Sequence, residues 1–314
     1  MKKIFILIAC LALISSCTGS ESSSRAAKKM LILGFDGMDP VMLDKYMTEG
    51  VMPNFKALKE KGDFKSLATS MPPQSPVAWS DLITGMNPGG HGIFDFIARD
   101  PLTYSPYLST SKTTDAKKSL SVGEWVFPIS EAETTLMRRG KAFWKILEEH
   151  GIPATVLHVP ANFPPEETKA KTISGMGTPD IKGTYGTFSF YTTRDLKNKK
   201  SAESGIVFQV ELKNNIIKTE LTGSPNTFKK EKPMTAVPLI IKVDPENPVA
   251  LIQVQDKEFI LREGEWSDWV NVEFKLIPLQ KVNGICRFHL SKVHPYLELY
   301  VTPVNIDPSK PILP

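Results

Sequence analysis

Cysteine is rare in this sequence, with three residues among 314. Cys10 lies in an apolar N-terminal segment and Cys17 ends a short motif described below, which leaves Cys286 without a partner for an intrachain disulfide. Cys286 lies in an apolar run, and this setting favours a buried, unreactive thiol.

A surplus of charge of either sign is also absent. The formal net charge is +4 at pH 7. Nucleic-acid-binding proteins concentrate Lys and Arg on one face, whereas the dense basic run here, Lys197–Lys200, lies in a polar stretch typical of a solvated loop. The sequence therefore indicates no nucleic-acid-binding surface, and its 41% apolar content is that of an ordinary globular protein.

Apolar runs long enough to cross a bilayer as a helix are missing too. The run Ile4–Ile14 follows two lysines and has the length and charge pattern of a signal peptide. Positions 14–17 read Ile-Ser-Ser-Cys, which resembles a bacterial lipobox. We therefore predict a lipoprotein signal peptide over residues 1–16 and lipid attachment to Cys17, with an ordinary signal peptide and a chance cysteine as the alternative.

The lipid on Cys17 would attach the protein to a membrane. Residues 17–29 are rich in serine and suit a tether that holds a folded domain away from that membrane. We therefore expect an exported protein, lipid-anchored to the bacterial cell envelope at the outer membrane or facing the periplasm.

Strand and helix patterns alternate over residues 30–183. The apolar runs Met30–Gly34 and Ile152–His158 are typical of buried parallel strands, and Phe64–Thr69 is a further candidate strand. First-turn prolines and amphipathic spacing predict helices over Pro40–Glu49, Pro53–Lys61, Ser75–Thr84 and Lys141–His150. This alternation predicts an α/β fold with a parallel sheet and helices on both faces.

Helical periodicity disappears after Gly183, where short strand-like runs alternate with turn residues. We predict a β-rich antiparallel domain over residues 184–305, inserted into the α/β domain, and a return segment over residues 306–314. The predicted strands are Ile206–Leu212, Ile216–Leu221, Val237–Val243, Val249–Val254, Glu258–Leu261, Val270–Leu276, Gly284–Leu290 and Leu297–Val301.

Asp36 directly follows the first predicted strand, within Gly34-Phe35-Asp36-Gly37. Catalytic groups collect at the carboxyl ends of parallel strands, and a carboxylate there can hold a metal ion. An Asp-Gly pair after a strand is also a common turn, so the residue by itself leaves both interpretations open.

Ser75 opens a predicted helix and is followed by Pro76. If Ser75 is only an N-cap, its role is structural: its hydroxyl caps the N-terminus of the helix. The same position lies beside free backbone N–H groups and the positive end of the helix dipole, which favour an alkoxide and an incoming phosphate. A serine needs a metal or a base to become a nucleophile, and Asp36 could hold that metal.

His91 lies in a glycine-rich segment over residues 84–96 that lacks the Gly-Lys-Ser/Thr of a P-loop. It could be a metal ligand, but a structural histidine that holds a tight loop is the favoured interpretation.

Taken together, these motifs resemble the type I phosphodiesterase/nucleotide pyrophosphatase family of the alkaline phosphatase superfamily. Order and spacing match over the front part of the chain. The matching residues are Leu33-Gly34-Phe35-Asp36-Gly37, Ser75-Pro76 with Trp79-Ser80, Thr84-Gly85, and Pro88 with His91-Gly92-Ile93.

The resemblance implies an alkaline-phosphatase-like fold and hydrolysis of phosphate esters by a phosphodiesterase or phosphatase. It implies two divalent metal ions, usually zinc (Zn²⁺), with Asp36 and Ser75 as ligands of one. It also implies in-line displacement at phosphorus by Ser75 through a covalent phospho-serine intermediate.

The sequence departs from the family pattern in two ways. Nucleotide pyrophosphatases have a phosphate-binding Asn three residues after the nucleophile, where this chain has Ala78. The family's remaining ligands lie in Asp-His motifs that this sequence lacks, and His289 and His294 would face opposite sides of a strand. We therefore expect the front part of a longer hydrolase, poorly active by itself.

Two other functions stay open at this point. One is a catalytically inert, truncated lipoprotein that acts as a binding protein. The other is a lipid-anchored carbohydrate-binding protein, suggested by Trp266 and Trp269, although core packing is the favoured explanation for those two residues. The oligomeric state and the substrate are not indicated.

Overall fold

The computed structural model describes residues 29–114, 116–195, 201–202 and 204–310. The predicted signal peptide, the lipid site at Cys17 and nearly all of the tether therefore lie outside the described residues. The chain divides into two compact units: Met1–Lys112 with Leu136–Met176, and Thr113–Thr135 with Gly177–Pro314. No helix within the described residues is both long and apolar enough to cross a membrane.

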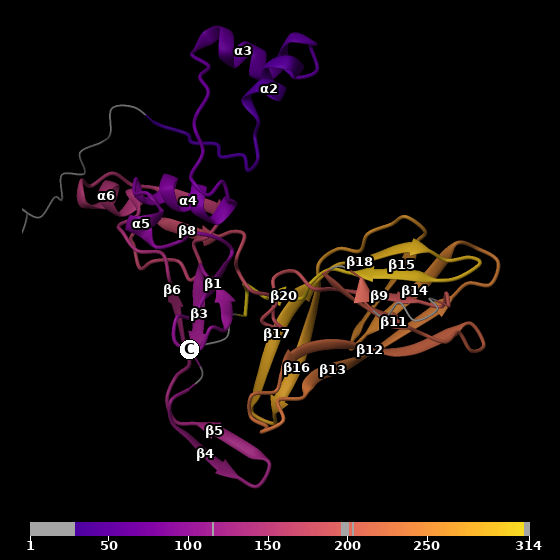
Figure 1. Ribbon diagram of the computed structural model, residues 1–314. Helices are drawn as coiled ribbons and strands as arrows, with labels where there is room; N and C mark the ends of the chain where they lie inside the picture. The colour runs from indigo at the N-terminus through magenta and orange to yellow at the C-terminus, as the bar shows by residue number, and fades with distance from the viewer. Residues whose placement is uncertain (1–28, 115, 196–200, 203, 311–314) are drawn as a thin grey trace, which may run out of the picture. The chain divides into compact units, whose positions relative to one another are not determined.

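The first unit contains the helices (Figure 1). They are α2 (Pro40–Thr48), α3 (Pro53–Lys61), α4 (Ser75–Thr84), α5 (Pro88–His91) and α6 (Phe143–Glu149). Helices α2 to α5 all have a proline in the first turn, where the missing N–H costs no hydrogen bond. The four predicted helices are thus confirmed, with ends that differ by at most a few residues.

Short strands complete the first unit. They are β1 (Ile97–Arg99), β2 (Pro106–Leu108), β3 (Ser111–Thr114), β6 (Glu133–Leu136), β7 (Thr155–Val159) and β8 (Lys171–Ser174). The chain passes to the second unit within two of them, β3 and β6. Strands β1 and β2 pair, β3 pairs with β6, and β7 pairs with β8 in parallel. The strand predicted over Ile152–His158 is thus present as β7.

The prediction of a strand over Met30–Gly34 was wrong. This segment is non-regular, and Met30 and Leu31 are 87% and 81% exposed. Phe64–Thr69 is not a strand either. An apolar run becomes a strand only where a neighbouring strand accepts and donates its backbone hydrogen bonds. The described residues form a mixed α/β fold with few helices and many strands, without a parallel sheet covered on both faces.

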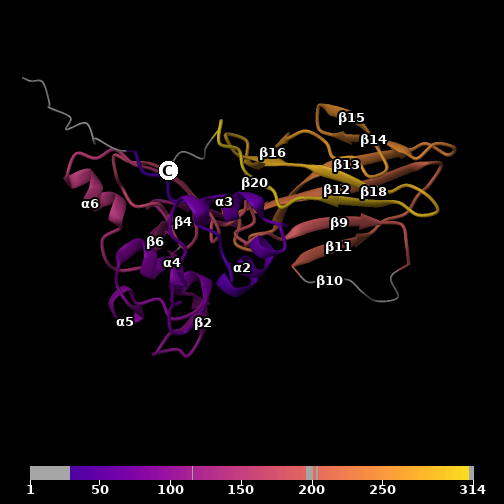
Figure 2. The ribbon, with the colours of Figure 1, turned by 90° about the horizontal axis from the view of Figure 1, so that it is seen from above.

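The second unit is built from strands, and no helix occurs among the described residues from 184 to 305. A hairpin of β4 (Ser119–Val122) and β5 (Trp125–Pro128) precedes three sheets. One sheet has the order β12 (Ile216–Pro225), β13 (Met234–Val243), β14 (Val249–Val254), β15 (Lys257–Arg262), all antiparallel. Strands β12 and β13 lie side by side in Figures 1 and 2.

The other two sheets hold the remaining strands of this unit. One has the order β16 (Val270–Ile277), β17 (Gln280–Cys286), β20 (Asn305–Ile306). The other has the order β10 (Ser201–Ala202), β11 (Gly205–Gln209), β9 (Phe188–Thr192), β19 (Glu298–Val301), β18 (Phe288–Lys292). Strands β9 and β11 pair in parallel, so the expected antiparallel arrangement has one exception.

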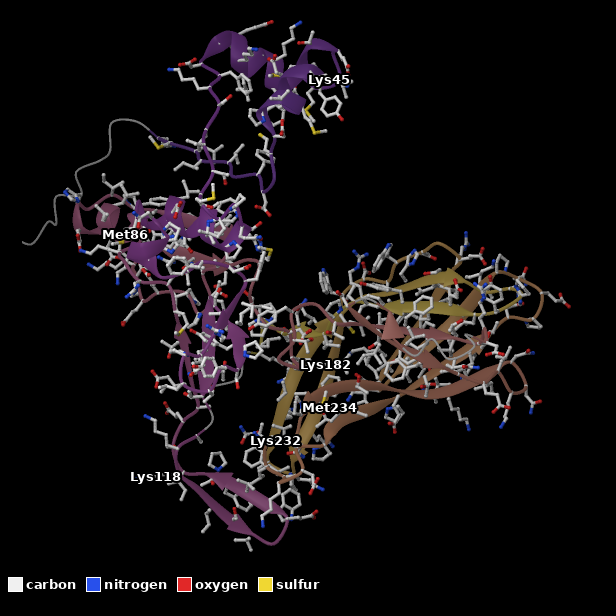
Figure 3. The ribbon with its side chains drawn as sticks, viewed as in Figure 1. Lys45, Met86, Lys118, Lys182, Lys232 and Met234 are labelled. Atoms are coloured by element: carbon white, nitrogen blue, oxygen red, sulfur yellow. The ribbon has the colours of Figure 1, made fainter. Side chains whose placement is uncertain are left out.

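Alternating burial along the strands produces the core of the second unit. In β13, buried residues such as Leu239 and Ile241 alternate with more exposed ones, as expected for a sheet with one covered face. Cys286 is buried in this core, and burial raises its pKa to about 12, so the thiol is unreactive as the sequence indicates. Burial also lowers the pKa of Lys182 (Figure 3), which donates to Thr222 Oγ1 at 2.8 Å.

Trp266 and Trp269 do not pack in the core. Their side chains are 43% and 57% exposed, so core packing does not explain them. They lie in the segment between β15 and β16, where Trp266 forms an isolated β-bridge with His289.

Candidate active site

Helix α4 brings two side chains to Asp36. Ser75 and Trp79 are one helical turn apart and therefore lie on the same face of the helix. The Ser75 hydroxyl donates to Asp36 Oδ2 at 3.0 Å, and the Trp79 indole N–H donates to Asp36 Oδ1 at 3.2 Å. Both carboxylate oxygens are thus held by α4, and Asp36 and Ser75 lie side by side, as sharing one metal ion would require.

Gly34 permits this close approach. A Cβ atom at position 34 would lie 2.4 Å from the Cη2 atom of the Trp79 ring, so any side chain there would clash with the indole. The Gly-Phe-Asp-Gly segment therefore packs against α4 because its first residue is glycine, and Asp36 lies two residues further on.

Helix α4 begins at Ser75 as predicted, but its N-cap is one residue earlier than expected. Gln74 is the N-cap and Ser75 is the first helical residue, so the Ser75 hydroxyl is not used for capping and binds Asp36 instead. The N–H groups of Val77 and Ala78 both donate to the Gln74 carbonyl. Pro76 has no N–H. Among the described residues of the first turn, the Ser75 N–H is therefore the one backbone donor left for an anion, fewer than the sequence suggested.

The two oxygen atoms of the site, Ser75 Oγ and Asp36 Oδ2, are accessible from solvent. Asp36 is exposed and Ser75 is half-buried, so a ligand can reach both. Two oxygens 3.0 Å apart suit a shared divalent cation. No group of three or more His, Cys, Asp or Glu side chains able to hold a metal occurs within the described residues.

His91 has a structural role in this geometry. It is buried, its Nε2 lies 2.7 Å from Asp81 Oδ1, and its Nδ1 accepts a hydrogen bond from the Ile93 N–H at 3.1 Å. Because Nδ1 is an acceptor, the proton of a neutral ring is on Nε2 and points to Asp81. Both nitrogens are occupied, which agrees with the favoured interpretation of a loop-holding histidine.

The two C-terminal histidines do not form a pair. His289 contacts Ser291 Oγ and the Gly264 carbonyl, at 2.9 and 3.2 Å, whereas His294 contacts the Asp244 carbonyl at 3.0 Å. His289 lies on β18 (Phe288–Lys292) and His294 lies beyond its end, so the two imidazoles have separate partners.

Two features of the first unit were not anticipated from the sequence. The contact of Trp79 with Asp36 could have been suspected from its spacing of four residues from Ser75. The second feature is buried Arg138, whose Nη2 donates to Asn162 Oδ1 at 3.2 Å and to Glu166 Oε1 at 3.1 Å. Burial lowers the Arg138 pKa, and no local pattern in the sequence indicates the ion pair, because its partner lies 28 residues away.

Comparison with protein families assigns the chain to a class of enzyme. The model of the type I phosphodiesterase/nucleotide pyrophosphatase family matches residues 30–235, about two thirds of the sequence. The chain therefore belongs to the type I phosphodiesterase/nucleotide pyrophosphatase family, and the resemblance noted in its motifs is confirmed. No curated protein and no solved structure matches it significantly.

Proposed function

We propose that this protein hydrolyses phosphate esters, as a phosphodiesterase or phosphatase, at a site formed by Asp36 and Ser75. The observation that carries the proposal is the 3.0 Å hydrogen bond from the Ser75 hydroxyl to the Asp36 carboxylate, at the N-terminus of α4. Membership of a phosphodiesterase family supports the reaction class. Ala78 provides no side-chain amide to contact phosphate, so the proposal covers monoesters and diesters alike.

In the proposed reaction, Ser75 Oγ attacks phosphorus in line with the leaving group. The new P–O bond to Ser75 forms as the bond to the leaving oxygen breaks, which gives a phospho-serine. Asp36 Oδ2 accepts the hydrogen bond of the Ser75 hydroxyl and takes its proton as the P–O bond forms; that proton then passes to solvent, and the departing oxygen is protonated by water. Water then attacks the phospho-serine, and Ser75 recovers its hydroxyl as inorganic phosphate or a phosphomonoester leaves.

Asp36 and Ser75 are also the proposed ligands of one divalent cation, with zinc the usual ion of the family. Such an ion would supply positive charge that stabilises the serine alkoxide. Trp79 fixes the orientation of the carboxylate through its second oxygen. A second ion would need further ligands, and the described residues contain no group of three or more His, Cys, Asp or Glu side chains that could supply them.

The finer fold assignment is a proposal as well. We infer that the parallel pair β7 and β8 corresponds to part of an alkaline-phosphatase-like sheet. Its support is the parallel register of Thr155–Leu157 with Lys171–Ile173 in a chain of this family.

The direct test is hydrolysis of aryl phosphate monoesters and diesters by the purified chain with added zinc or manganese. Turnover should disappear in Ser75→Ala and in Asp36→Ala, and a +80 Da adduct, about the mass of HPO₃, should be trapped on the Ser75 peptide with a monoester. A matched control is Ser80→Ala, because Ser80 lies on α4 but donates to the Pro76 carbonyl. Turnover that survives both site variants would refute the proposal.

A further inference from the structure

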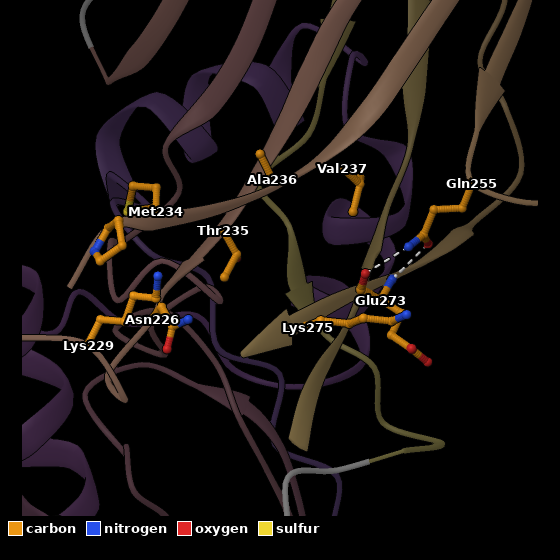
Figure 4. A pocket seen from close by; sticks show the side chains of 10 residues that line it. Asn226, Lys229, Met234, Thr235, Ala236, Val237, Gln255, Glu273 and Lys275 are labelled. Atoms are coloured by element: carbon orange, nitrogen blue, oxygen red, sulfur yellow. Dashed lines mark hydrogen bonds between the residues drawn. The ribbon is translucent and has the colours of Figure 1, made fainter. Parts of the chain in front are cut away.

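Two cavities open on the second unit, and they differ in what their lining can offer a ligand. The smaller, about 290 Å³, is shown in Figure 4. Several of its polar groups are already engaged: Gln255 exchanges two hydrogen bonds with the Glu273 backbone, at 2.8 and 3.0 Å, and Lys229 lies over the Trp125 ring. This cavity therefore has few unused groups for recognition.

The larger cavity, about 570 Å³, lies between β15 and the segment that leads into β16. We name it the tryptophan groove. Its volume is within the usual range of small-molecule sites, roughly 300–1,000 Å³. The residues that line it are Asp256, Lys257, Glu258, Phe259, Ile260, Leu261, Glu265, Trp266, Ser267, Asp268, Trp269, Val270 and Asn271.

Trp266 is held rigidly although 43% of it is exposed. The Arg287 guanidinium lies 5.2 Å from its ring centre, the His289 ring 4.7 Å and the Tyr300 ring 5.8 Å. Arg287 is itself fixed, because its Nε donates to the Ser267 carbonyl at 2.8 Å. The indole is thus a preorganised flat surface, which reduces the entropy lost when a ligand stacks on it.

Trp269 provides a second flat surface in the same groove. It is 57% exposed, and its ring makes no recorded contact with another aromatic ring among the described residues. An exposed indole in a cavity is costly to hydrate and is a common anchor for a ligand. The two indoles are not stacked on each other, so they do not form a closed cage around one small cation.

The polar lining of the groove consists mainly of hydrogen-bond acceptors. Glu258 and Asp268 contribute carboxylates, and Glu265 does so while one of its oxygens accepts from the Arg262 N–H at 2.8 Å. Lys257 is the only cation lining the groove, and it pairs with Asp256 at 3.0 Å. This negative lining disfavours anionic ligands, including phosphate esters and acidic polysaccharides.

We propose that the tryptophan groove binds an uncharged oligosaccharide. The C–H face of a sugar ring carries partial positive charge and stacks on the electron-rich face of an indole. Each indole can stack on one sugar ring, and the carboxylates accept hydrogen bonds from the sugar hydroxyls. The role is independent of phosphate ester hydrolysis, since the groove contains neither Asp36 nor Ser75.

The test is calorimetric titration of the full chain with uncharged hexasaccharides. The probes are β-1,4-linked glucose, β-1,4-linked N-acetylglucosamine, β-1,4-linked mannose and α-1,4-linked glucose. At least one should bind with a Kd between about 10 µM and 1 mM. Trp269→Ala should weaken that binding at least about tenfold, which is about 1.4 kcal/mol. The control Leu279→Ala removes an apolar side chain that is 96% exposed and lies outside the groove, and it should bind as the parent does.

Trp266→Phe keeps an aromatic ring against Arg287 and gives a second readout if Trp269→Ala unfolds. It should weaken binding less than Trp269→Ala does, with the thermal unfolding midpoint within a few degrees of the parent. The proposal is overturned if none of the four sugars binds at about 5 mM, or if Trp269→Ala binds as tightly as the parent. Binding of choline but of no hexasaccharide would also overturn it, and would indicate a cation site.

Discussion

At the scale of single residues, the contact between Trp79 and Asp36 allows the orientation of the carboxylate to be tested without changing a reacting group. Trp79→Phe keeps the packing but removes the N–H that holds Asp36 Oδ1. We expect kcat for aryl phosphate esters to fall roughly tenfold with little change in KM, because a mobile carboxylate orients Ser75 less often. Stability should change by less than about 1 kcal/mol, since Asp36 is exposed. Equal kinetics in parent and variant would count against the positioning role.

For His91 we predict the opposite: replacing it should strongly lower stability and leave the metal content unchanged. His91→Ala would leave the buried Ile93 N–H without its acceptor and open a cavity beside Asp81. The expected loss in free energy of unfolding is about 2–4 kcal/mol. Chemical denaturation measures it, and zinc content per folded chain should stay at the parent value. A drop in bound zinc with unchanged stability would instead identify His91 as a ligand.

At the scale of elements, the site depends on how closely one non-regular segment can approach one helix. Gly34→Ala places a methyl group 2.4 Å from the Trp79 ring, so the segment that carries Asp36 must move away from α4. Hydrolysis should decrease at least about tenfold, because misplacing a catalytic group by about 1 Å is costly. Gly89→Ala is the matched control, since its added Cβ would meet only an ordinary contact at 3.4 Å with Asn87 Oδ1. Comparable losses in both variants would mean that general destabilisation, and not the approach to α4, is responsible.

The elements also differ in how well local sequence predicts them. Helices α2 and α3 begin at a proline, and α4 has one at its second position, because a proline in the first turn affects only the neighbouring backbone. Met30–Gly34 has the composition of a buried strand but no strand among the described residues pairs with it. A strand is defined by a partner elsewhere in the chain, so composition alone is a weaker guide for strands than for helices.

At the scale of the whole molecule, the number of side chains that can bind metal ions limits the rate of phosphate ester hydrolysis. Asp36 and Ser75 are two ligands, and no cluster of three or more metal-binding side chains occurs in the part of the chain that the structure describes. We therefore expect this chain to hydrolyse aryl phosphate esters with kcat below about 1 s⁻¹, the low end for typical enzymes. Steady-state assays across zinc and manganese concentrations measure this, and a rate well above that value would show that further ligands assemble in solution.

Export and lipid attachment are proposals for the molecule as a whole. We propose that Cys17 carries lipid and anchors the protein to the cell envelope. In a Gram-negative host, Cys17→Ala should lose metabolic labelling by palmitate, whereas Cys286→Ala should retain it because Cys286 is buried in the second unit. Persistent labelling of the Cys17→Ala protein would rule the anchor out.

The sequence by itself determined features that depend on a few neighbouring residues. Proline positions located the helices, strand-length apolar runs located most of the second unit, and motif order identified the family. Each of these signals acts locally: a proline restricts its own backbone, and alternation of apolar residues reflects the pleat of a single strand.

Tertiary structure decided which distant residues meet. Ser75 and Asp36 are 39 positions apart, and their hydrogen bond exists because Gly34 lets the first segment approach Trp79. Burial of His91 and exposure of Trp266 likewise follow from packing, and the sequence around each residue is compatible with either state. The physical reason is that contacts across tens of residues depend on how whole elements pack, which no short stretch of sequence specifies.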